Sequence, residues 1–142
     1  MTQRPDLDVA ATLRLPPEKR SAGEARRFIG QFCAATELAE ELCQTAALLT
    51  SELVTNAVVH GKTSATVEVH RPADILRVSV RDDNPVLPAV GDAPPLDAES
   101  GRGLTIVAAL AHRWGVEKVD GGKAIWFELE VPGAGDAEGA SP

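Results

Sequence analysis

The chain has few basic residues and no long run of them. Its 142 residues include 14 Lys and Arg against 21 Asp and Glu, so the formal net charge is −7 at pH 7. A protein this acidic repels phosphate-rich surfaces unless its basic residues cluster strongly. Direct binding of nucleic acid, or of an anionic membrane surface, is therefore not expected.

Long apolar segments and cysteine patterns are also lacking. The first ten residues contain no apolar core of a signal peptide, and no later stretch is expected to cross a membrane. The two cysteines, Cys33 and Cys43, match neither a metal-ligand spacing nor a disulfide framework. Cys33 falls on an apolar helical face and is predicted to lie in the core. We expect a cytoplasmic protein.

The composition permits one folded domain. Hydrophobic residues make up 44% of the chain and charged residues 25%, which is typical of soluble globular proteins. We predict a frayed N-terminus over residues 1–8 and a domain over 9–131. The Gly-, Ala- and acid-rich tail, residues 132–142, is predicted to be disordered.

Hydrophobic periodicity predicts the order of elements. A strand over 9–15 is followed by a helix from Ser21, where Ser21 and Glu24 form a potential capping box. The remaining elements are a helix over 38–59, strands over 65–70 and 75–80, a Pro-rich loop over 83–100, a helix from the glycines at 101–103 to about 112, and strands over 114–119 and 123–131. The hairpins imply antiparallel pairs. The expected fold is an α/β two-layer sandwich with a mixed, mostly antiparallel sheet and helices on one face.

Three polar residues recur along the second helix. Glu52, Asn56 and His60 are four residues apart, so they align along one side of an α-helix. An amide oxygen can ligate Mg²⁺, a carboxylate one turn away can accept a proton, and a histidine one turn further can meet a phosphate. The alternative is a solvated helix flank with local hydrogen bonds.

Two further segments could carry chemistry. Asp82 ends an apolar strand, where a carboxylate could accept a hydrogen bond from an exocyclic amine, or could simply start a turn. Gly101, Arg102 and Gly103 open a predicted helix, where backbone N–H groups and an arginine could approach an anion. Flexible entry into the helix is the alternative explanation for the glycines.

Taken together, these segments resemble the GHKL superfamily of ATPases and its Bergerat-type fold. Residues 52–61 look like its N box, Asp82 like the aspartate of its first glycine box, and residues 100–104 like its second glycine box. The resemblance implies bound ATP and Mg²⁺, with residues 83–100 as the ATP lid. Its implied roles are Glu52 as general base, Asn56 as magnesium ligand, Asp82 as reader of adenine, and contacts to phosphates from Gly101, Arg102, Gly103 and Leu104, with His60 and Lys62 nearby.

Residues 104–107 and 114–127 most resemble those of small stand-alone bacterial anti-sigma-factor kinases. That resemblance implies a serine/threonine kinase that acts on a STAS-type anti-anti-sigma protein, holds a sigma factor and forms a homodimer. The alternative is a non-catalytic module that sequesters such a partner. Three departures favour the alternative, because Asn84 and Val86 occupy glycine positions and Ala124 replaces a threonine near the nucleotide.

Overall fold

The predicted order of elements is largely confirmed. The computed structural model describes residues 8–86 and 98–132. Within them the chain forms β1 (Asp8–Leu15), α1 (Ser21–Ala35), α2 (Glu40–Thr55), a π-helical segment η2 (Asn56–His60), β2 (Ala65–Pro72), β3 (Ile75–Asp82), α3 (Ala98–Leu110), β4 (Arg113–Val119) and β5 (Gly122–Glu130). The predicted frayed N-terminus, except for Asp8, and nearly all of the predicted disordered tail lie outside the described residues.

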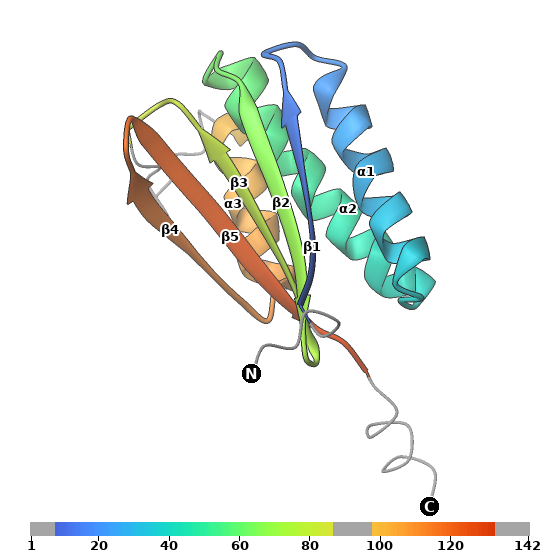
Figure 1. Cartoon of the computed structure of the whole chain (residues 1–142). Helices are drawn as coiled ribbons and strands as arrows, with labels where there is room; N and C mark the ends of the chain where they lie inside the picture. The colour runs from blue at the N-terminus through green and yellow to red at the C-terminus, as the bar shows by residue number, and fades with distance from the viewer. Residues whose placement is uncertain (1–7, 87–97, 133–142) are drawn as a thin grey trace, which may run out of the picture.

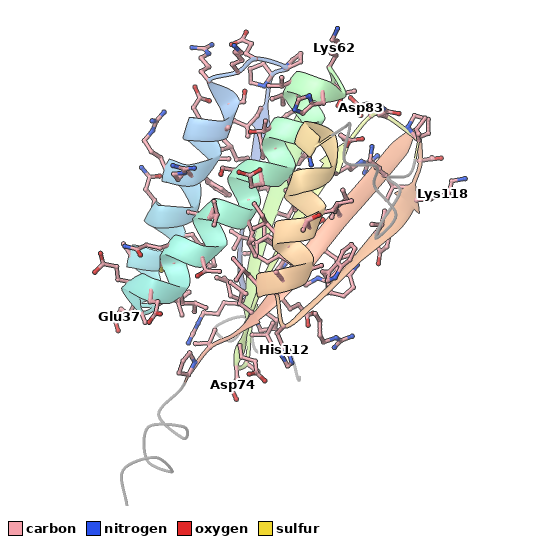
Figure 2. All side chains as sticks on the ribbon, turned by 180° about the vertical axis from the view of Figure 1, so that it is seen from behind. Glu37, Lys62, Asp74, Asp83, His112 and Lys118 are labelled. Atoms are coloured by element: carbon pink, nitrogen blue, oxygen red, sulfur yellow. The ribbon has the colours of Figure 1, made fainter. Side chains whose placement is uncertain are left out.

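The five strands form one open sheet in the order β1-β2-β3-β5-β4. The predicted fold class is confirmed. The sheet was expected to be mixed and mostly antiparallel, and every strand pair among the described residues is antiparallel. All three helices lie on one face of this sheet (Figures 1 and 2). Strand β3 lies in the middle of the sheet, where its last residue is flanked by β2 and β5.

The core lies between the sheet and the helices. Alternate residues of the strands are buried against it, among them Val67, Val78 and Phe127, and Ile29 and Leu49 meet them from α1 and α2. The opposite face of the sheet carries polar residues around Trp126, whose ring lies 4.2 Å from the guanidinium carbon of Arg77. This alternation decides which residues of β5 can face a site under the helices.

Helix α1 does not use the predicted capping box. Its N-cap position is Arg20, which makes no side-chain capping hydrogen bond. The Ser21 hydroxyl instead donates to the carbonyl of Pro16 at 2.7 Å and is buried there. Because Ser21 is already the first helical residue, its side chain bonds backward to the preceding turn and cannot cap the helix.

The predicted helix over 38–59 is two segments. Regular α-helix ends at Thr55, and the Gly61 N–H then donates to the Asn56 carbonyl at 2.8 Å, an i→i+5 bond. A Cβ at position 61 would lie 2.9 Å from the Ala57 carbonyl oxygen, so glycine is needed for this close approach. π-Helical turns of this kind often occur at functional sites.

The stretch Glu40–His60 also has the length and mean hydropathy, 1.2, of a candidate membrane span. Half of it is buried inside the fold, where it supplies the central helix of the core. Sequence inspection alone does not single it out, because its polar residues interrupt the apolar run.

Helix α3 begins at Ala98, before the two glycines rather than at them. Ala and Glu are good helix formers, and an acidic residue such as Glu99 suits the positive end of a helix dipole. The predicted loop over 83–100 is therefore wrong at its last three residues. Its central part, residues 87–97, lies outside the described residues.

Candidate functional site

A pocket of about 200 Å³ lies where η2, the end of β3, the start of β5 and α3 meet. Its walls combine apolar side chains with a few polar ones: Leu53, Asn56, His60, Gly61, Val80, Asp82, Asn84, Val86, Leu104, Lys123 and Ile125. These residues come from four separate parts of the sequence. The pocket is thus a product of the tertiary fold.

Four residues that the sequence predicts for the site line this pocket together: Asn56, His60, Asp82 and Leu104. Asn56 is the first residue of η2 and His60 the last, so the π-helical turn holds both at one pocket wall. Gly101, Arg102 and Gly103 lie in the first turns of α3, directly before Leu104, and their side-chain positions are not described.

Glu52 and Lys62 are placed differently. Glu52 is half-buried on α2, one α-helical turn before Asn56, and is not among the residues that line the pocket. Lys62 follows η2 with a left-handed φ of 59° and an exposed side chain, which extends away from the molecule in Figure 2. The predicted alignment of Glu52, Asn56 and His60 on one α-helical side ends where the π turn begins.

Asp82 lies at a strand end inside the pocket and also begins a turn. It is the last residue of β3 and only 6% exposed, so its carboxylate is a strand-end group inside a pocket. Its Oδ1 also accepts the Asn84 N–H at 2.8 Å, which makes it the start of a turn. The Asn84 side chain in turn accepts the Val86 N–H at 3.0 Å, which explains why an Asn at this glycine position is accommodated.

Lys123 is a pocket residue that the sequence analysis did not single out. Its ammonium nitrogen lies 3.2 Å from each carboxylate oxygen of Asp82 and donates to the Asn84 carbonyl at 3.0 Å. It is 9% exposed, so this is a buried ion pair. A Cβ at Gly122 would collide with the Asp82 carbonyl, and the absence of a side chain there lets β5 bring Lys123 against Asp82.

The expected role of Ala124 as the residue near the nucleotide is not supported by the geometry. Ala124 pairs with Arg81 and lines a polar hollow on the open face of the sheet, away from the pocket. Strand alternation puts Lys123 and Ile125 on the pocket side. Counting back by two from the apolar residues Ile125, Phe127 and Leu129 would have identified Lys123 from the sequence.

The residues of the pocket are of the kinds that fit a magnesium–nucleotide complex in which the protein and the phosphates would share the metal. Among the described residues no group of three or more His, Cys, Asp or Glu side chains could hold a metal ion by themselves. Mg²⁺ needs few protein ligands, because it keeps waters and binds substrate phosphates, so the Asn56 amide oxygen would suffice as a protein ligand. The pocket volume is below the 300–1,000 Å³ usual for ligand sites.

Comparison with known proteins identifies the family of this chain. A profile of the histidine kinase-like ATPase domain matches residues 15–129, and the chain belongs to this family. Among solved structures, it is similar to the crystal structure of the RsbU and RsbW domains of Rv1364c from Mycobacterium tuberculosis, with 19% identity and a TM-score of 0.67. The match covers 86% of this chain and 32% of that one, so this chain spans about a third of the length of the chain in that structure. The search of curated proteins found no similar sequence.

Proposed function

We propose that the chain binds Mg-ATP in this pocket and regulates a sigma factor through protein partners. The observation that carries the proposal is the convergence of Asn56, Asp82 and Leu104 on one pocket from three distant segments. Asn56 would hold Mg²⁺ and the buried Asp82 would accept a hydrogen bond from the base. The partners expected are a sigma factor, a STAS-type anti-anti-sigma protein, or both.

The activity proposed is phosphorylation of a serine or threonine on the STAS-type partner. Phosphoryl transfer depends on positioning and on electrostatic stabilisation more than on covalent chemistry, so a small site is adequate. Glu52 would accept the hydroxyl proton, and Arg102 with the backbone of α3 would lie near the phosphates. The similarity to the structure of the RsbU and RsbW domains of Rv1364c supports the fold on which this proposal rests.

Thermal unfolding with and without Mg-ATP tests nucleotide binding. At about 100 times its Kd, the ligand adds roughly 2.7 kcal/mol to the free energy of unfolding, which raises Tm by several degrees. Asn56→Ala should abolish this rise while leaving Tm without ligand nearly unchanged. An equal rise in both proteins would contradict the assignment of Asn56.

Catalysis is tested separately with Glu52→Ala. We expect this variant to keep the Mg-ATP-induced rise in Tm, since Glu52 does not line the pocket, but to lose transfer of labelled phosphate to a STAS-type protein. Transfer at the wild-type rate would eliminate Glu52 as the general base. No transfer by the wild-type chain would leave nucleotide binding intact and remove the kinase activity from the proposal.

A second candidate function, a non-catalytic binding module, is favoured by the Lys123–Asp82 ion pair. Lys123 already contacts both oxygens of the carboxylate that would read adenine. If this contact competes with adenine for Asp82, Lys123→Met should increase the Mg-ATP-induced rise in Tm. A wild-type protein that shows no rise, beside a variant that does, would support the binding module. A smaller rise in the variant would show that Lys123 helps the pocket to bind adenine instead.

A further inference from the structure

The tertiary fold brings the two cysteines together at the closed end of the α1–α2 hairpin. Cys33 lies in the last turns of α1 and Cys43 in the first turn of α2. The two helices pack side by side along their length (Figure 1). Cys33 is 2% exposed and Cys43 is partly exposed, and both thiols are free.

The turn between the helices holds the two cysteines in a defined relation. Glu37 adopts a left-handed φ of 60°, its N–H donates to Ala34 O at 3.3 Å and the Leu38 N–H donates to Cys33 O at 3.0 Å, which is the Schellman pattern. The Cys43 thiol contacts the Leu38 carbonyl at 3.8 Å. Leu38 therefore bonds to the Cys33 carbonyl and to the Cys43 thiol, and Cys43 lies close enough to Cys33 to contribute to the raised pKa of the Cys33 thiol.

Cys43 is also the cysteine that a small oxidant can reach. It lines an apolar groove of about 410 Å³ between the two helices, together with Gly30, Ala47 and Leu48. Gly30 leaves open space on the α1 side, because a Cβ there would meet no atom within 4 Å. Two thiols are too few for a structural metal site, and no third ligand lies with them among the described residues.

We propose that Cys33 and Cys43 form a reversible intramolecular disulfide, with Cys43 as the thiol that attacks a hydroperoxide and Cys33 as the resolving thiol. The Cys43 sulfur takes one oxygen from hydrogen peroxide and becomes a sulfenic acid, releasing water. The Cys33 sulfur then attacks the Cys43 sulfur. The S–O bond breaks, and the departing hydroxide takes the Cys33 proton as a second water. Two thiols lose two electrons in total and the peroxide gains them.

The environment of Cys33 controls the speed of the second step. Burial, reinforced by the contact with Cys43, raises the pKa of the Cys33 thiol to about 12. Only a small fraction is thiolate at neutral pH, so closure should be slow at pH 7 and faster at pH 9.

The test treats the full chain with hydrogen peroxide, blocks free thiols with iodoacetamide and measures intact and peptide masses. We expect a monomer that is two hydrogens lighter and unalkylated, with the peptides of Cys33 and Cys43 joined and the bond reversed by dithiothreitol. The oxidised monomer should unfold at a higher temperature, because the cross-link restricts the unfolded chain. Disulfide-linked dimers, or Cys43 oxidised to sulfinic acid beside a free Cys33, would overturn the proposal.

Two variants make the test specific. Cys43→Ser, at a partly exposed position, should leave the fold intact and make the remaining Cys33 inert to peroxide. Cys33→Ala should let the Cys43 sulfenic acid persist, where dimedone can trap it, before further oxidation. If dimedone traps the Cys43 sulfenic acid in Cys33→Ala but the wild-type chain forms no disulfide, the proposed Cys33–Cys43 disulfide is also overturned. None of these readouts depends on nucleotide binding or kinase activity.

Discussion

The two ends of α2 differ in hydrogen bonding and in what they hold. At its start, the Schellman turn at Glu37 and Leu38 joins it to α1 with regular backbone hydrogen bonds. At its end, the helix changes to π winding at Asn56 and stops at Gly61 beside the pocket. Figure 2 shows this contrast by position: Glu37 lies at one end of the molecule, with Asp74 and His112, and Lys62 and Asp83 lie at the other.

The comparison shows that the irregular backbone of this fold lies at the pocket end. The end that closes the hairpin has ordinary helix-terminating geometry, which orders the core. The pocket end has a π turn, consecutive Asp82 and Asn84 side-chain turns, and a buried ion pair. Each of these features holds a polar group in place at the pocket.

The largest effect is expected from breaking the ion pair. Lys123→Met leaves the Asp82 carboxylate buried without its cation, which should lower the free energy of unfolding by about 3 kcal/mol. The double variant Asp82→Asn with Lys123→Met removes the uncompensated charge and keeps an acceptor for the Asn84 N–H. It should recover stability to within about 1 kcal/mol of wild type. Urea unfolding of the three proteins measures both effects.

If Lys123→Met alone is as stable as wild type, the pocket end does not rely on this pair. If the double variant is no more stable than Lys123→Met, the lost free energy belongs to packing of the lysine stem rather than to the charge.

An intermediate effect of opposite sign is expected in the regular part of α2. The buried Thr50 hydroxyl has no hydrogen-bond partner among the described residues. Thr50→Val replaces it with a methyl group of similar shape and should raise the free energy of unfolding by about 1 kcal/mol. Mg-ATP binding should not change, because Thr50 does not line the pocket. A lower Tm for Thr50→Val would show that the hydroxyl is satisfied.

The smallest effects compare the two left-handed residues at opposite ends. Glu37 and Lys62 have φ of 60° and 59°, which favour glycine, and both are exposed. Glu37→Gly and Lys62→Gly should each change the free energy of unfolding by less than about 1 kcal/mol, with stabilisation favoured at Glu37, the position after a helix C-cap.

Only Lys62→Gly should weaken Mg-ATP binding, and only if Lys62 reaches the phosphates when nucleotide is bound. Titration of both variants with Mg-ATP separates the cases. Equal affinities would remove Lys62 from the candidate site and leave Asn56 and His60 as the polar residues of η2 that belong to it.

Much of the fold could be predicted from the sequence because its elements are strongly patterned. Alternation in the strands over 65–80 and 114–131 predicts the hairpins, and the apolar stripe of Leu42, Ala46, Leu49 and Leu53 predicts α2. The start of α3 and the end of α2 were harder to predict from the sequence, because a glycine can indicate either the end of a helix or a close approach of two backbone segments. Gly61 does the second, by admitting a π turn.

The sequence by itself determined the family, the apolar face of each element and most of the polar residues at the site, because local spacing and residue chemistry are written along the chain. Only the tertiary structure decided which of those residues meet. It placed Asn56 and Asp82 at one pocket and left Glu52 and Lys62 outside its walls. It paired Asp82 with Lys123 across two strands, and it placed Cys33 and Cys43 at the same end of the α1–α2 hairpin. These pairings depend on strand register and helix packing, which no single segment specifies.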